Sequence, residues 1–290
     1  MAQGGQRLSA DGSPRRTLLI IGGAEDKLGR SVVLKRFVRL AGGRQSRIVI
    51  IPTASSFVDE VVESYGRVFT RLRAGGDIRV VHAASRAAAR DPELVARLED
   101  ATAVFMSGGS QLKLSQFLVG TPVGDAIIDA YRRGVVVAGT SAGASVMSRF
   151  MISLGDEGLT PRQRSSQLTA GLGLLEDVIV DQHFDQRGRY GRLMSIVANS
   201  PNLLGIGIDE NTAIVMTGGR RFQVLGDGAV YAFNAWDMTY ANLTEESHDR
   251  ALSMFGTRVD VLSQGDVYDL ATRTPTSHPA HEVEAQLETA

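Results

Sequence analysis

Residues 135–146 (VVVAGTSAGASV) constrain the fold of this chain most, because they join an apolar strand to a run of small residues through a glycine-rich turn. Residues 135–138 are typical of a short strand that is buried on both faces. Gly139 and Gly143 flank Ser141 in the pattern Gly-x-Ser-x-Gly, which between a strand and a helix predicts a sharp turn that exposes one serine hydroxyl. The alternative is a plain glycine turn in which Ser141 only caps the helix.

The first 150 residues alternate between apolar strands and amphipathic helices. Strands are predicted at residues 17–21, 47–51, 78–81, 101–106 and 135–138, and helices at 31–41, 58–72, 92–98, 112–118 and from 122 onward. This alternation is typical of a parallel sheet covered on both faces. We therefore expect an α/β three-layer sandwich with a mostly parallel central sheet. Its binding crevice should lie at the carboxyl ends of the strands, which residues 22–27, 107–111 and 139–143 directly follow.

The pattern changes after residue 150. Residues 151–168 are polar and predict a surface loop or lid. Further strands are predicted near residues 178–180, 205–208, 213–216, 222–225, 229–233 and 259–262, as antiparallel additions that complete the same sheet. We expect a disordered lead-in at residues 1–16, a single α/β catalytic domain at 17–271 and a flexible tail at 272–290.

Charge and composition exclude several classes of function. The formal net charge of −1 argues against nucleic acid or an anionic membrane as a partner. The chain has no cysteine, which excludes disulfides, thiolate zinc sites and a cysteine nucleophile and fits the reducing cytoplasm. No apolar run approaches the roughly 20 residues that a membrane-spanning helix needs. The first residues also lack the apolar core of a secretory signal.

A serine hydroxyl becomes a good nucleophile only beside a base that a third group orients. Of the five histidines, only His183 directly follows a predicted strand on the side of the sheet where Ser141 is expected. We therefore select His183 as the base. The third group is chosen from the carboxylates of Asp181, Asp185, Asp209 and Glu210. Glu210 is preferred and Asp209 is the fallback, because both follow another strand end.

Two further features fit acyl transfer at Ser141. The backbone amide of Ala142 is one expected donor to the oxyanion, and the pair Gly108-Gly109, with Gly109 preferred, is expected to supply another. Three arginines at positions 187, 189 and 192 follow His183 closely. Such a cluster is either a solvated face or a clamp for substrate carboxylates. We expect neither a metal nor a cofactor.

Five motifs occur in order along the chain: GGAEDK at 22–27, SGGSQ at 107–111, GTSAGA at 139–144, DQHF at 181–184 with its three arginines, and GIGIDE at 205–210. Together they resemble the cyanophycinases. That family comprises serine exopeptidases related to the aspartyl dipeptidases and, by fold, to the class I glutamine amidotransferases. The likeness covers about residues 18–234 and implies a flavodoxin-like fold.

The resemblance implies hydrolysis of cyanophycin, a storage polymer with a polyaspartate backbone and arginine on each β-carboxyl, to β-aspartyl-arginine. It implies that Ser141 is the nucleophile, His183 the general base and Glu210 its orienting acid. The matching substrate-pocket positions are Gln111, Asp181, Gln182, Arg187, Arg189 and Arg192. A homodimer is also implied. Ser110 departs from the family pattern, which has Asn or Asp before the glutamine.

Three other hypotheses about the function remain open. The first is an aspartyl dipeptidase that acts on short peptides and not on the polymer. The second is a metallohydrolase with Asp181, His183, Asp185 and Glu210 as ligands, although one histidine among carboxylates is a weak zinc set. The third is a binding protein without activity, because a fold alone does not fix function.

Overall fold

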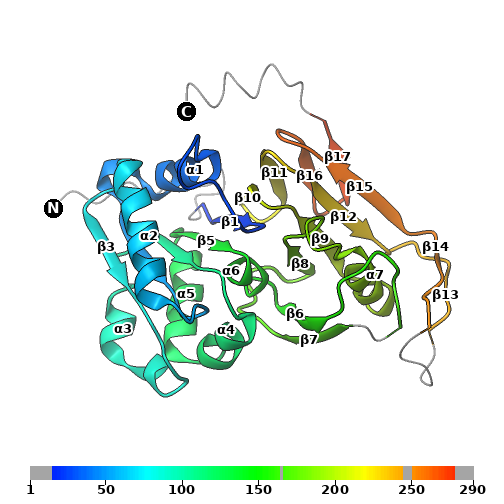
Figure 1. Cartoon of the computed structure of the whole chain (residues 1–290), viewed down its shortest axis with the longest axis horizontal. Coiled ribbons are helices and arrows are strands. Elements are labelled where there is room, and N and C mark those ends of the chain that lie inside the picture. Colours follow the sequence, from blue (N-terminus) through cyan, green and yellow to red (C-terminus); the bar gives the residue numbers. More distant parts are fainter. Residues whose placement is uncertain (1–14, 164–165, 244–249, 278–290) are drawn as a thin grey trace.

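A nine-stranded sheet forms the centre of the computed structural model, which describes residues 15–163, 166–243 and 250–277 (Figure 1). Five of its strands are parallel to one another, and the other four are each antiparallel to their neighbours. In spatial order the strands are β17 (Thr274–Thr276), β16 (Val267–Asp269), β11 (Arg221–Gly226), β10 (Thr212–Thr217), β1 (Thr17–Ile21), β5 (Val136–Thr140), β4 (Ala103–Met106), β2 (Arg47–Ile51) and β3 (Asp77–Val80). The predicted mostly parallel α/β sheet is confirmed.

Helices cover both faces of this sheet, because its strands alternate apolar side chains between two cores. On β1, Leu19 and Ile21 pack against α1 (Val32–Ala41) and α2 (Val58–Arg71). Leu18 and Ile20 belong to the core on the opposite face. That face is covered by α3 (Pro92–Ala96), α4 (Gln111–Leu118), α5 (Pro122–Arg132) and α6 (Ala142–Ser145). Two 3₁₀ turns, η1 (Gly43–Gln45) and η2 (Ala88–Arg90), complete the connections.

Four strands form a second sheet, which corrects the prediction that all the later strands complete the first one. Its order is β15 (Arg258–Leu262), β12 (Val230–Asn234), β9 (Leu204–Ile208) and β8 (Val178–Gln182). Of the later strands that were predicted, only β10 and β11 join the central sheet. Strands β16 and β17, which were not predicted, join it as well. The second sheet packs Val180 and Ile206 into a core shared with the central sheet. Its other face carries α7 (Tyr190–Asn199) over Ile179 and Phe233.

The segment expected to be a strand-poor loop contains a hairpin instead. Strand β6 (Phe150–Gly155) pairs with β7 (Ser166–Ala170) through a bulge between Ile152 and Leu154. Met151 and Ile152 are buried, so the start of β6 packs into the molecule although most of the segment is polar. A short pair, β13 (Tyr240–Ala241) and β14 (Met254–Phe255), lies beyond the second sheet (Figure 1).

Regular structure extends beyond the predicted end of the catalytic domain at residue 271. Strand β17 lies beyond residue 271, where we expected a flexible tail, because Thr274–Thr276 pair with β16. Residues 278–290 of that tail and residues 1–14 of the predicted lead-in lie outside the described residues. Within the described part of the chain, no helix combines the length and apolar character that crossing a membrane requires.

Candidate active site

The Gly-x-Ser-x-Gly stretch forms the sharp turn that its pattern predicts, between the central strand β5 and helix α6. Ser141 has φ 54°, in the left-handed region that side chains other than glycine rarely adopt. A Cβ on Gly139 would lie 2.1 Å from the carbonyl oxygen of Gly143, and a Cβ on Gly143 would lie 2.3 Å from that of Met106. The two flanking glycines are therefore required by the close packing of strand, turn and helix.

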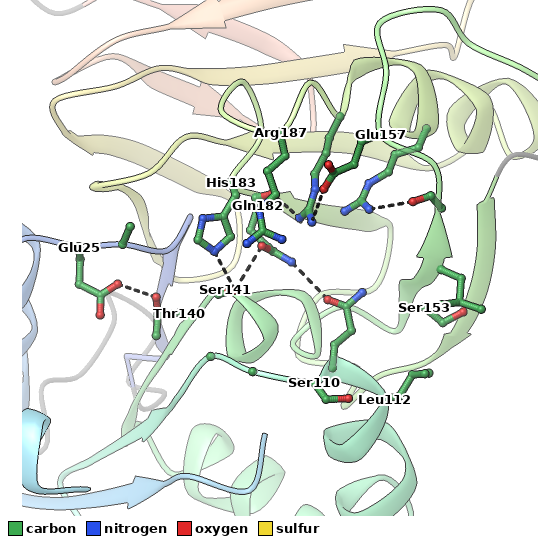
Figure 2. Close-up of a pocket in the computed structure, with 18 of the residues that line it drawn as sticks. Glu25, Ser110, Leu112, Thr140, Ser141, Ser153, Glu157, Gln182, His183 and Arg187 are labelled. Atoms are coloured by element: carbon green, nitrogen blue, oxygen red, sulfur yellow. Dashed lines mark hydrogen bonds and ion pairs between the residues drawn. The ribbon is translucent and has the colours of Figure 1, made fainter. Parts of the chain in front are cut away.

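Ser141, His183 and Glu210 form a chain of hydrogen bonds, although they come from two different sheets. The Nε2 atom of His183 lies 3.0 Å from Ser141 Oγ, and its Nδ1 atom lies 2.5 Å from Glu210 Oε1. His183 directly follows β8, and Glu210 lies just beyond β9. Figure 2 shows the imidazole pointing toward Ser141. The three residues selected from the sequence are thus brought together.

The imidazole reaches Ser141 by lying against a glycine. A Cβ on Gly23 would lie 2.4 Å from both Cε1 and Nε2 of the His183 ring, so no larger residue fits there without moving the ring. The backbone amide of His183 donates to the carbonyl oxygen of Gly22 at 2.8 Å. The Ser141 hydroxyl also has a second acceptor, Gln182 Oε1, at 3.3 Å.

The surroundings of His183 favour its neutral form. Burial is the main cause that lowers its pKa below the usual 6.5, and the positive charge of Arg187 lowers it further. The hydrogen bond to Glu210 opposes these effects. With the Nδ1 proton held by Glu210, Nε2 is left free to accept a proton from Ser141 at neutral pH.

The other carboxylates considered for the third position are engaged elsewhere. Asp209, the fallback, accepts the backbone amides of Asp185 and Ala229, each at 3.0 Å. Burial raises its pKa. The carboxylate of Asp185 accepts the hydroxyl of Tyr190 at 3.0 Å. In the described ranges, no three Asp, Glu, His or Cys side chains gather as a metal site. The four ligands of the metallohydrolase hypothesis, Asp181, His183, Asp185 and Glu210, therefore do not gather at one metal site in this part of the chain.

The predicted oxyanion donors lie on both sides of the serine. Ala142 is the first residue of α6, so its amide has no acceptor within the helix. On the neighbouring turn after β4, a Cβ on Gly108 would lie 3.1 Å from the Cβ of Ser141. Gly109 lines the same pocket as Ser141. The backbone segments of both predicted donors therefore lie beside Ser141.

A pocket of about 890 Å³ opens over Ser141 and His183. It is also lined by five of the six residues predicted to bind substrate: Gln111, Gln182, Arg187, Arg189 and Arg192. The side chains of Gln111 and Gln182 are joined by a hydrogen bond of 3.2 Å from Gln182 Nε2 to Gln111 Oε1. Gln111 Nε2 in turn donates to the carbonyl oxygen of Ile152 on the β6–β7 hairpin. Ser110 caps α4 by accepting the amide of Lys113.

The three arginines differ in how far their charge is neutralised. Arg192 is buried and forms two hydrogen bonds with Asp181, which lies behind the pocket, one of them 2.6 Å from Nε to Oδ2. Arg189 is also buried and lies 3.5 Å from Asp181 and 3.4 Å from Glu157. Arg187 is exposed, and no acidic side chain in the described ranges pairs with it. Of the three arginines, Arg187 therefore presents the least neutralised positive charge.

Several pocket residues were not selected from the sequence. Glu25, Lys27, Tyr65, Thr140 and Glu157 all line the pocket. Glu25 and Lys27 belong to the GGAEDK motif, which gave the only signal for them because it follows a strand end. Tyr65 comes from the middle of α2, and nothing in its local sequence marks it as a site residue.

This chain is similar to known proteins of one peptidase family. Residues 18–224 match the model of peptidase family S51. A cyanophycinase of Geminocystis herdmanii is 37% identical over 262 residues, covering 90% of this chain and 96% of its own length. A cyanophycinase of Nostoc sp. is 39% identical over 261 residues, with coverages of 90% and 87%.

The fold also matches solved structures. A peptidase from an acI-B1 Actinobacterium has a TM-score of 0.60 at 24% identity, covering 88% of this chain and 97% of its own. A putative peptidase E protein from Listeria monocytogenes has a TM-score of 0.52 at 19% identity, with coverages of 74% and 100%. At these identities the two structures support the fold alone. The sequence matches establish that the chain belongs to peptidase family S51 and is a hydrolase of the serine-peptidase type.

Proposed function

We propose that this chain is a cyanophycinase, an exopeptidase that hydrolyses cyanophycin to β-aspartyl-arginine dipeptides. The observation that carries the proposal is the similarity to proteins of that name, at 37% and 39% identity over nine tenths of the chain. The exposed Arg187 supports it, because this pocket guanidinium has no acidic partner among the described residues and suits a substrate carboxylate.

In the proposed reaction, Ser141 Oγ attacks the carbonyl carbon of a backbone amide while His183 Nε2 accepts its proton. The backbone amides of Ala142 and Gly109 stabilise the negative charge on the carbonyl oxygen. The tetrahedral intermediate then collapses, the C–N bond breaks, and His183 returns the proton to the leaving amine. Water repeats these steps on the acyl-enzyme and releases the free carboxylic acid. Glu210 holds His183 in the required tautomer and stabilises the imidazolium that forms.

We assign substrate binding to Gln111, Gln182 and the three arginines, each for a chemical reason. The exposed Arg187 is suited to attract a substrate carboxylate, since its charge is not neutralised. Arg189 and Arg192 are held in place by their acidic partners. Asp181 supports the pocket through Arg192, and the two glutamine amides can hydrogen bond the substrate backbone.

The proposal is tested by incubating the protein with insoluble cyanophycin and determining the mass of the released products. We expect β-aspartyl-arginine from the parent and none from Ser141→Ala. Release of dipeptide by the serine variant at the parent rate would contradict the mechanism. Cleavage of short aspartyl peptides without attack on the polymer would show an aspartyl dipeptidase. Failure of a serine-directed phosphonate to label Ser141 would indicate a binding protein without activity.

We also propose the setting in which the enzyme works. Residues 17–271, together with strand β17, would act as one catalytic domain. The family resemblance supports a homodimer, and the lack of cysteine supports the cytoplasm. The near-zero net charge supports action without nucleic acid or membrane partners. Light scattering and cell fractionation test these points, and a monomer or a membrane-bound form would contradict them.

A further inference from the structure

The loop after β1, residues 22–31, forms hydrogen bonds with His183 itself and with the residues next to Ser141 and Glu210. Its Gly22 carbonyl accepts the amide of His183 at 2.8 Å, and its Gly23 carbonyl accepts the amide of Asn211, the neighbour of Glu210, at 2.9 Å. The amide of Asp26 donates back to Asn211 Oδ1 at 2.8 Å. The loop contains the GGAEDK motif, to which the proposed mechanism gives no role.

Within this loop, Glu25 makes the contact to the serine turn. Its side chain is only 4% exposed, although it is a carboxylate. Thr140, the residue before Ser141, donates its hydroxyl to Glu25 Oε2 at 2.6 Å, and Tyr65 donates its hydroxyl to Oε1. Figure 2 shows Glu25 and Thr140 on the far side of Ser141 from Arg187. Burying a carboxylate is costly unless it is hydrogen bonded, and here both oxygens are bonded to neutral hydroxyls.

We propose that Glu25 is a positioning residue that fixes Ser141 through the hydroxyl of Thr140, with Tyr65 fixing Glu25. The role follows from the backbone of the turn. Ser141 has φ 54°, a strained conformation that persists only where neighbouring contacts fix it. Its own amide is held by the Ile21 carbonyl at 3.0 Å, and the Glu25–Thr140 bond holds the residue before it.

Loss of the Glu25–Thr140 bond lets the end of β5 relax and moves Ser141 Oγ out of line with His183. A positioning role therefore lowers kcat and slows every reaction of the Ser141 hydroxyl. A binding role for the Glu25 charge, as a subsite for a cationic substrate group, would instead raise KM. The inference rests on the proposed function, since it takes Ser141 as the nucleophile, but these two readouts separate the roles.

The test compares Thr140→Val, which removes the hydroxyl at nearly constant shape, with Thr140→Ser, which keeps it. Thr17→Val, at the opposite end of the same sheet, controls for the loss of a buried threonine hydroxyl. We expect kcat on cyanophycin and the rate of phosphonate labelling of Ser141 both to fall by about tenfold or more in Thr140→Val. KM should stay within about twofold of the parent.

Thr140→Ser should recover most of that loss, and Tyr65→Phe should show a smaller fall in the same direction. Thr17→Val should be labelled at the parent rate. Labelling of Thr140→Val at the parent rate, or a rise in KM at constant kcat, would overturn the inference. The labelling needs no cyanophycin, so a parent protein that leaves the polymer intact refutes the proposed substrate alone. The role of Glu25 is then decided by the labelling rates of the variants.

Discussion

Replacing Gly23 with alanine should separate His183 from Ser141 with a single methyl group. The new Cβ would lie 2.4 Å from Cε1 and Nε2 of the imidazole, whereas ordinary contact begins at 3.4 Å. The ring therefore has to retreat by about 1 Å, which is enough to lengthen its 3.0 Å hydrogen bond to Ser141 Oγ beyond bonding range. A misplacement of this size costs about 100-fold in rate.

The assay is kcat on cyanophycin, measured together with the melting temperature. Alanine at the φ of Gly23, +105°, is also strained, at a cost of roughly 1–2 kcal/mol in stability. Gly42 provides a matched control, because its φ is +107° and a Cβ there meets nothing closer than 3.9 Å. Gly42→Ala should therefore lose similar stability and keep its kcat.

Two results would refute this reasoning. The first is a Gly23→Ala enzyme that keeps more than half of the parental kcat, because the imidazole would then have another way to reach Ser141. The second is an equal loss of kcat in Gly42→Ala, because backbone strain alone would then explain the effect.

Three further predictions concern the charged groups of the site. Glu210→Gln should lower kcat by about 10³–10⁴, whereas Asp209→Asn should cost far less, and the reverse order would move the orienting role to Asp209. Arg187→Gln removes a positive charge that lowers the pKa of His183, so this pKa should rise. The acid limb of the plot of kcat/KM against pH should then move to higher pH, and a limb at the parental pH would contradict this. Asp181→Asn leaves the buried Arg192 without its negative partner, so the free energy of unfolding should fall by about 3–5 kcal/mol. Denaturant titration measures this free energy, and an unchanged value would contradict the ion pair.

The sequence predicted the parts of the site that depend on local chemistry. The turn at Ser141 was predictable because its two glycines are required by contacts within a few residues and with the next strand. His183 was identified by its place after a strand. The choice between Asp209 and Glu210 was open in the sequence, because both residues follow the same strand end. The structure distinguishes them, since Glu210 bonds His183 while Asp209 bonds backbone amides.

The parts that the sequence missed depend on contacts between distant segments. Strands β8 and β9 are as apolar as the central strands, so nothing local indicates that they pair with each other and with β12 in a sheet of their own. The β6–β7 hairpin was hidden by its bulge and its polar second strand. Glu25 was overlooked because its burial depends on Tyr65, 40 residues away.

The division of the site between two sheets affects the stage of synthesis at which the enzyme can become active. Ser141 and its turn are complete when the parallel strands have formed, but His183 and Glu210 belong to a sheet made from later residues. Chains are synthesised from the N-terminus, and their earlier parts emerge first. A nascent chain on the ribosome therefore carries a serine without a base. In the proposed mechanism, peptidase activity can therefore begin only after residues through at least Glu210 have emerged and docked.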